Sequence, residues 1–493
     1  MPRPAASTAD QRRPIRRSRP PRIADSTPGD PGRRGGRAWG EFRDQPSEIG
    51  DQTSESGHRL VVGSDISLTS SIPHDRPADG WWLIPSSYTP PVPEIDSDAT
   101  QRFLTEMPRA LATYGTPAHR LEEAMVLCAE KLGQNAEFFS MPTAVMCAIG
   151  EGDQTRMHMV RVMPGEVDLE KLDCVDAILG KVLRDEMTPR EALGAIAQVR
   201  AAPTRYHPLL VVLCVGVASA GAARFFGGSW IDLLTAASVG LLAGGIGLFT
   251  QKHRQVARVT DFASALLASL TATLLAGRLN GLTPGIVIIS SLIGLVPGLT
   301  LTVAINELAT KNLVAGTARS MHALMVLLSI GFGVGAGQVL AADLSLPAVP
   351  GDPMPQWTDP VAIVLVPMAL TVHFRARPRD VFVIVPAAAV GYYGARFGTA
   401  LTGPELGACM GAFAVGVFGN LHARLARRPT AITHVPGIML LVPGAVGYTS
   451  VSSFMAGDVM TGVETAFRMV IVATGIVIGL LLANVLLPSK QSL

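Results

Sequence analysis

Charged residues are scarce in this sequence, and the scarcity is confined to one part of it. Only 16% of the 493 residues are Asp, Glu, Lys or Arg, whereas about 25% is usual in a soluble globular protein. Residues 210–493 hold 26 of these charges in 284 positions. A soluble domain of that size cannot cover itself in water with so few charges. Residues 210–493 therefore indicate a membrane domain and exclude a purely cytosolic enzyme.

Metal-binding, nucleotide-binding and catalytic motifs are also missing. The five cysteines form no CxxC pair and no Cys/His ligand spacing, which argues against a disulfide framework or a zinc site. The glycine-rich run at residues 331–337 lies inside an apolar segment, without the strand that precedes a dinucleotide site, and there is no P-loop. The spacing of His119, Cys128, Ser140 and His158 defines no nucleophile and base. We therefore expect no cofactor, no metal and no catalytic residue.

The first 205 residues divide into a tail and a small domain. Residues 1–98 are rich in Pro, Arg, Ser, Asp and Gly and are predicted to be disordered. The basic run at residues 12–22 suits anionic lipid or nucleic acid, but a solvated tail is favoured, so no nucleic-acid partner is expected. Residues 99–205 predict a small α+β domain with two helices within 100–132, a hairpin of 136–149 and 155–163, and helices at 168–186 and 188–200.

Ten apolar segments follow from residue 206 onward. Most of them reach the ~20 residues that a helix needs to cross ~30 Å of hydrocarbon. With the N-terminus in the cytoplasm, the cytoplasmic loops carry about 12 Lys or Arg residues and the outer loops 4, as the positive-inside rule requires. We expect an all-α polytopic membrane domain, with both chain termini cytoplasmic, and helices at residues 208–226, 231–250, 260–277, 282–304, 321–341, 358–374, 380–400, 405–423, 431–450 and 466–487.

These segments contain an internal repeat. The motif Leu-Val-Pro-Gly at residues 295–298 recurs at residues 441–444, 146 residues later. The same offset brings the third, fourth and fifth segments onto the eighth, ninth and tenth. Because five helices per half is an odd number, the halves, residues 206–350 and 351–493, enter the membrane from opposite sides. Such 5+5 inverted repeats are typical of secondary transporters with a site near the membrane midplane.

The chemistry of the site is predicted at the two Pro-Gly pairs. In lipid, a backbone opened by Pro-Gly is tolerated only where protein or water satisfies its polar groups. We predict two broken helices whose ends bind a small polar solute, and a kink that serves packing is the alternative. The candidate substrate-binding residues are Pro297, Gly298, Thr300, Thr302, Asn306, Pro443, Gly444 and Ser452.

Glu307 is the only carboxylate close to either break. A carboxylate buried in a membrane domain is a typical proton relay, so Glu307 is the candidate proton-coupling group. The alternative is a surface ion pair between Glu307 and Lys311, four residues later on the same helix. Both interpretations stay open.

Three stretches of the chain resemble a known family. They are residues 115–133, which begin Gly-Thr-Pro-Ala-His-Arg, residues 224–228 (Arg-Phe-Phe-Gly-Gly), and residues 296–319 with Val-Pro-Gly, Asn-Glu-Leu and Ala-Gly-Thr-Ala-Arg. Together with the order of domains, they make the chain similar to the threonine/serine exporter family of bacterial inner-membrane proteins. The resemblance implies export of threonine and serine, driven by the proton gradient, in a bacterial inner membrane.

The predicted function is thus secondary export of small polar amino acids, with the solute, protons and the lipid bilayer as partners. A dicarboxylate exporter on the same scaffold is one alternative, because similar two-polypeptide relatives are linked to dicarboxylate export. A membrane-anchored signalling or hydrolytic protein acting through residues 99–205 is another. A homo-oligomer is left open.

Overall fold

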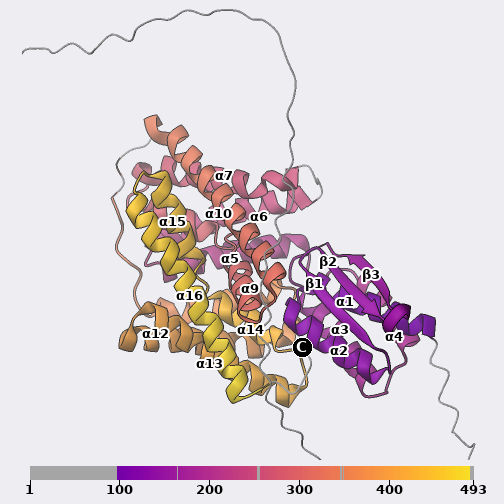
Figure 1. Cartoon of the computed structure of the whole chain (residues 1–493). Coiled ribbons are helices and arrows are strands. Elements are labelled where there is room, and N and C mark those ends of the chain that lie inside the picture. Colours follow the sequence, from indigo (N-terminus) through magenta and orange to yellow (C-terminus); the bar gives the residue numbers. More distant parts are fainter. Residues whose placement is uncertain (1–96, 164, 252–255, 345–346, 348, 489–493) are drawn as a thin grey trace, which may run out of the picture. The chain divides into compact units, whose positions relative to one another are not determined.

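The fold is taken from a computed structural model, in which residues 97–163, 165–251, 256–344, 347 and 349–488 are described (Figure 1). The predicted disordered tail, residues 1–98, lies outside the described residues apart from Ser97 and Asp98. These two residues begin the first described helix, which therefore starts two residues before the predicted domain boundary at residue 99.

The N-terminal domain, residues 97–205, combines helices with a three-stranded antiparallel sheet of order β1-β2-β3. Its core lies between α1, α2, α3 and the inner face of the sheet, where Phe103, Met107 and Leu121 are fully buried. Its elements are α1 (Ser97–Tyr114), α2 (Ala118–Lys131), β1 (Ala136–Met141), β2 (Ala144–Ile149), β3 (Arg156–Arg161), α3 (Leu169–Leu183) and α4 (Pro189–Ala201).

The hairpin predicted around residues 150–153 is confirmed as β2 and β3, but its first arm, residues 136–149, is itself folded into a second hairpin. β1 pairs with β2, and β2 pairs with β3, both antiparallel. Residues 136–149, taken as a single arm, turn back at Pro142 and Thr143. Proline has no N–H for a ladder hydrogen bond and does not continue a central strand. The other boundaries agree with the prediction, including the capping box of Thr188 and Glu191 that begins α4.

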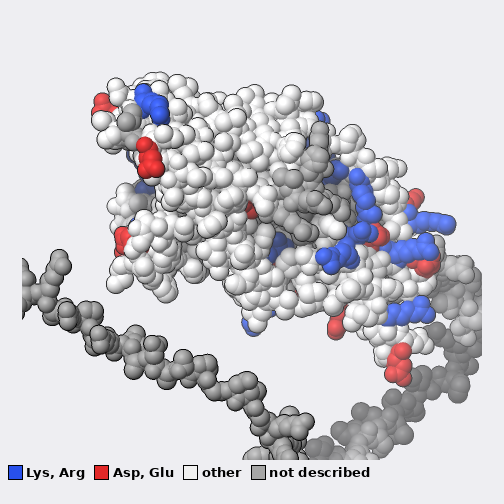
Figure 2. Space-filling view, turned by 90° about the horizontal axis from the view of Figure 1, so that it is seen from above, with Lys and Arg blue, Asp and Glu red and all other residues white. Residues whose placement is uncertain are grey.

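From Pro208 onward the described chain is almost entirely helical. Eight helical segments within the described residues are long and apolar enough to cross a membrane, and Gly298–Ala309 and Thr358–His373 are shorter apolar helices. On the face in Figure 2, charged side chains gather towards the two ends and leave a broad uncharged band between them. The helices are α5 (Pro208–Phe225), α6 (Trp230–Gln251), α7 (Thr260–Leu275), α8 (Pro284–Ser291), α9 (Gly298–Ala309), α10 (Leu313–Ala341), α11 (Thr358–His373), α12 (Val381–Thr402), α13 (Pro404–Ala426), α14 (Ala431–Met439), α15 (Gly444–Met455) and α16 (Val459–Leu486).

Helices at corresponding places in the two halves have corresponding partners. α7 packs on α10 as α13 packs on α16, and α9 packs on α10 as α15 packs on α16. α9 and α15 begin 146 residues apart, and so do α10 and α16. The halves also exchange contacts, because α9 packs on α16 and α15 packs on α10.

The glycines at residues 331–337 serve helix packing. A Cβ added at Gly333 would lie 2.6 Å from the carbonyl oxygen of Phe262, and one at Gly337 would lie 2.9 Å from that of Leu266. Both carbonyls belong to α7, so these glycines let α7 and α10 approach closely, as small residues do in membrane helix pairs.

Each Pro-Gly pair stands at the start of a helix, with proline as the N-cap residue and glycine as the first helical residue. The preceding helices end at Ser291 and Met439. Residues 292–297 and 440–443 therefore interrupt two apolar helices, and we call these segments the first and second break.

The two breaks touch each other. A Cβ added at Gly298 would overlap the Val442 side chain and lie 3.2 Å from the backbone nitrogen of Gly444. A Cβ added at Gly444 would lie 2.8 Å from Cγ1 of Val296. Only glycine at both positions lets the two chain segments come this close.

We expect Gly298→Ala to destabilise the protein by about 1–3 kcal/mol, because the new methyl group overpacks the contact between the breaks. The measurement is thermal unfolding of the purified full-length protein in detergent. Gly294→Ala is the matched control, since a Cβ there meets nothing within 4 Å. The double variant Gly298→Ala/Val442→Ala should recover part of the loss. Equal melting temperatures for Gly298→Ala and Gly294→Ala would contradict the contact.

Candidate functional site

A cavity of about 290 Å³ lies beside the breaks, and we call it the break cavity. Ile293 and Gly294 of the first break and Leu440 and Val442 of the second form one wall of it. Residues of α5, α11 and α12 form the rest, mostly apolar, with His373 and Tyr392 among them. The cavity therefore adjoins both interrupted helices, whose first-turn N–H groups have no partner within their own helix.

A second cavity, of about 150 Å³, lies between the N-terminal domain and the membrane domain. We call it the domain cavity. Residues of α9, α14 and α16 line its membrane side, with His434 and Asn484 among the polar ones. The turn between α1 and α2 closes it from the N-terminal domain.

The predicted site residues fall into separate places. Pro297, Gly298, Pro443 and Gly444 meet at the breaks, as described above. Thr302 and Asn306, on α9, line the domain cavity, and the Thr302 hydroxyl donates to the carbonyl oxygen of Gly298 at 3.0 Å. Thr300 and Ser452 are not among the residues that line either of these two cavities.

The counterpart of the domain cavity in the other half is filled. The residues 146 positions after Thr302 and before His434 are Tyr448 and Ile288. Tyr448 and Ile288 are 5% and 1% exposed and belong to one buried apolar cluster with Leu292 and Val334. A cavity therefore lies beside the N-terminal domain, and apolar side chains fill the corresponding place in the other half.

Glu307 is fully buried at the end of α9 and joins the two domains. Arg319 of α10 donates from Nε to Oε1 and Oε2 of Glu307 at 3.1 and 3.0 Å. The backbone N–H of Ala118, the first residue of α2, donates to Oε1 at 3.1 Å. The suggested partner Lys311 is exposed, and the structure gives Arg319 as the paired cation instead.

A second contact lies next to this one. The Asn312 amide donates to Oε2 of Glu122 on α2 at 2.9 Å, and Oε1 of Glu122 accepts from the backbone N–H of Ser140 at 2.7 Å. The turn between α9 and α10 is thereby tied to both α2 and β1. Figure 1 shows α9 beside the N-terminal domain.

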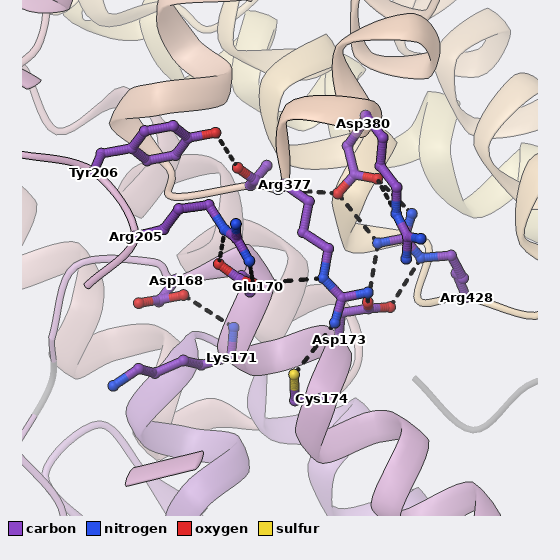
Figure 3. A network of polar contacts seen from close by, with 12 residues as sticks. Asp168, Glu170, Lys171, Asp173, Cys174, Arg205, Tyr206, Arg377, Asp380 and Arg428 are labelled. Atoms are coloured by element: carbon purple, nitrogen blue, oxygen red, sulfur yellow. Dashed lines mark hydrogen bonds and ion pairs between the residues drawn. The ribbon is translucent and has the colours of Figure 1, made fainter. Parts of the chain in front are cut away.

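A larger network joins α3 to the loops of the second half (Figure 3). Asp173 binds Arg377 at 2.8 Å and Arg428 through both carboxylate oxygens at 3.0 Å. Arg428 also pairs with Asp380, and Arg377 lies 3.6 Å from Glu170. Two of the loop arginines that indicated membrane orientation, Arg377 and Arg428, are thus bound to acidic residues of α3, which no local sequence signal predicted.

The C-terminal end of α5 makes a contact between the halves. Arg224 pairs with Asp359, at the start of α11, at 2.8 Å, and its Nε also donates to the Thr358 hydroxyl. Both charged side chains are largely buried, at 11% and 15% exposed. The connector between the halves adds two backbone hydrogen bonds, from Gly281 to Val349 and from Met354 to Gly228.

The described residues contain no candidate metal site, and two of their cysteines are poor nucleophiles. No group of three or more His, Cys, Asp or Glu side chains that could hold a metal ion occurs among them. Cys128 and Cys147 lie in the core of the N-terminal domain, where burial raises the pKa of each thiol to about 12. Such thiols are poor nucleophiles at neutral pH.

Comparison with known proteins assigns the chain to a family. A family model described as "Threonine/Serine exporter, ThrE" matches residues 359–486. A companion ThrE model, also of a threonine/serine exporter, matches residues 102–341. This chain belongs to the threonine/serine exporter family. The first model ends at residue 341 and the second begins at residue 359, so they lie on either side of the connector between the halves.

Curated relatives of this threonine/serine exporter family member come from yeasts. Pheromone-regulated membrane protein 10 of Debaryomyces hansenii is 29% identical over 378 residues, which cover 72% of this chain and 37% of that protein. The protein of the same name from Saccharomyces cerevisiae strain YJM789 is 29% identical over 374 residues, which cover 72% of this chain and 47% of that protein. The chain thus spans less than half the length of these two relatives.

No solved structure matches the chain. The family models and the relatives' names, with the eight apolar helical segments, identify a multi-pass membrane protein of an exporter family.

We expect Asp173→Asn to destabilise the full-length protein by about 3 kcal/mol, because it leaves two largely buried arginines without a shared carboxylate. Thermal unfolding in detergent measures the effect. Glu186→Gln is the control, since Glu186 forms an exposed pair with Arg184 and such pairs contribute at most about 1 kcal/mol. Similar shifts for both variants would argue against the α3 network as a domain contact.

Proposed function

We propose that this protein is a secondary active exporter of small polar amino acids, with threonine and serine as solutes. The observation that carries the proposal is the meeting of two interrupted helices beside a cavity between the halves. Helix N-termini attract a carboxylate, and free carbonyl groups attract an ammonium ion. Broken helices of this kind therefore suit a zwitterionic solute, and membership in the threonine/serine exporter family supports the choice of solute.

The membrane domain is proposed to be a 5+5 inverted repeat with ten crossings, residues 206–350 and 351–493. The offset of 146 residues between the starts of α9 and α15 and between those of α10 and α16, with the corresponding packing partners, supports the duplication. Two of the ten helical segments are short. They are α9, which directly follows the first break, and α11, which the offset pairs with α5. An odd number of crossings per half makes the orientations opposite.

Alternating access follows from an asymmetry between the halves. The domain cavity is open beside Thr302, whereas its counterpart beside Tyr448 is filled with apolar side chains. The Arg224–Asp359 pair closes the far side. We take this arrangement as the state whose cavity opens toward the N-terminal domain. Rocking of the halves about the breaks would open the other side.

The proposed solute contacts follow from the same symmetry. Thr302 and Asn306 offer a hydroxyl and an amide on the open side, and Thr300 stands nearer the break. Ser452, the counterpart of Asn306, would take over when the other side opens. The opened backbone at Pro297-Gly298 and Pro443-Gly444 would bind the charged ends of the solute.

Glu307 is proposed to couple transport to protons. Its carboxylate holds Arg319 and the first N–H of α2, so protonation would weaken both contacts and release the N-terminal domain from the end of α9. Proton binding and opening would thereby be linked. A purely structural latch is the competing role for this residue.

The proposed location is a cell membrane, with the N-terminal domain and both termini cytoplasmic. The excess of Lys and Arg in the loops on that side supports the orientation. A bacterial inner membrane is proposed from the resemblance alone, since the relatives reported above are yeast proteins.

Two other functions compete with amino-acid export. A dicarboxylate exporter on this scaffold needs cations for two carboxylates, and the membrane segments have few. An anchored hydrolase acting through residues 99–205 is disfavoured by the buried, weakly acidic thiols of its core.

Efflux from proteoliposomes tests the function directly. The purified full-length protein is reconstituted into vesicles loaded with labelled threonine, serine or succinate, and efflux is followed with and without a pH gradient. We expect threonine and serine to leave in a gradient-dependent manner and succinate to stay. Efflux of succinate alone would establish the dicarboxylate alternative, and no efflux of any of the three would refute the exporter.

We expect Glu307→Gln to abolish gradient-driven efflux of threonine while leaving threonine exchange intact, because the amide cannot carry the proton. Both rates are measured in the same vesicles. Glu405→Gln is the control, since Glu405 forms a pair with Arg468 that is 37% and 46% exposed. Unchanged net efflux by Glu307→Gln would exclude proton coupling at this residue, and equal loss of efflux and exchange would favour the latch.

A further inference from the structure

The N-terminal domain supplies part of the wall of the domain cavity. The turn between α1 and α2 places Thr116, His119 and Arg120 there, together with Thr302 and Asn306 of α9. Neither domain completes this cavity by itself. The hydrogen bond from the backbone N–H of Ala118, the first residue of α2, to Glu307 holds the turn in this position.

Two of these side chains have buried polar atoms without a hydrogen-bond partner. Thr116 is 5% exposed, and its Oγ1 has no partner. Nδ1 of His119 is also buried and without a partner. Burial, with Arg120 next to it, lowers the pKa of His119 to about 4, so the ring is neutral at pH 7. A buried unsatisfied polar atom costs about 1–3 kcal/mol, and a polar ligand in the cavity would remove that cost.

Arg120 sets the charge of the cavity. Arg120 is the only Arg, Lys, Asp or Glu among the described residues that line this cavity. A guanidinium group presents a planar fork of donors that matches both oxygens of a carboxylate. The volume of about 150 Å³ is well below the roughly 300–1,000 Å³ of sites for drug-sized ligands. The cavity therefore suits a small solute that carries a carboxylate.

We propose that Arg120, Thr116 and His119 of the N-terminal domain form, with Thr302 and Asn306, a binding site for the carboxylate of a small solute. The inference rests on the proposed function and assigns to the N-terminal domain a direct part in solute recognition. While the solute is in the domain cavity, Arg120 binds its carboxylate, and Thr116 and His119 satisfy their buried polar atoms on the solute. Thr302 and Asn306 contact its other end, and the opened backbone of the breaks binds its charged ends only after it has left this cavity. Release of α2 from Glu307 would dismantle the site.

The test compares solutes with and without a carboxylate on the full-length protein in detergent. Ligand binding to the folded state raises the melting temperature, so stabilisation is titrated with threonine, with succinate and with threoninol, which lacks the carboxylate. We expect the wild type to prefer threonine over threoninol at least tenfold and Arg120→Gln to lose that preference. Arg120→Lys should retain part of it. Arg102→Gln is the control, because Arg102 forms an exposed pair with Asp98 on α1.

A structural role for Arg120 would weaken all solutes alike, whereas carboxylate binding makes the loss depend on the carboxylate. An unchanged ratio of threonine to threoninol affinity in Arg120→Gln would overturn the inference, and threonine efflux by the wild type would leave the proposed function standing. Succinate binding that depends on Arg120, without threonine efflux, would support the site and refute amino-acid export. If Arg120→Gln fails to fold, Thr116→Val decides, with several-fold weaker threonine binding expected and unchanged binding counting against the site.

Discussion

The arrangement of this membrane domain depends on the contact between its two interrupted helices. A helix that is broken in lipid must have its free backbone groups satisfied by protein or by water. Here each break lies against the other, because Gly298 and Gly444 leave no side chain between Val296 and Val442. The contact joins the halves at their centre and leaves the break cavity beside it. The proposed solute-binding region and the proposed pivot of the two halves therefore lie at the same place.

The N-terminal domain is held to the membrane domain by charged contacts as well as by an apolar cluster that includes Phe374 and Ile432. Glu307, Glu122 and Asp173 each accept hydrogen bonds across the boundary. Buried ion pairs add little net stability, because desolvation offsets their attraction, but they fix geometry and break sharply when one partner changes charge. Such contacts suit a domain that closes a cavity reversibly.

Sequence patterns predicted the helices well and the site only in part. Long apolar periodic segments and the Pro-Gly pairs are local signals, so α9 and α15 begin at the predicted glycines. The turn at Pro142 was missed because both arms are apolar and the reversal takes two residues. Thr302 and Asn306 reach a cavity, but Thr300 and Ser452 do not line it, since a helix places residues two apart on different faces. The side chain of Arg120 gave no local sign of its role, as it belongs to another domain.

The sequence by itself determined the class of the molecule, most of its helices and the positions of both breaks. These properties follow from composition and short-range periodicity, which depend on neighbouring residues alone. Only the tertiary structure decided that the breaks touch and that α2 covers the domain cavity. It also decided that Glu307 pairs with Arg319 across the turn between α9 and α10. These contacts join residues up to 189 positions apart. A pairing over such a distance depends on how whole helices pack, which no single segment of the sequence specifies.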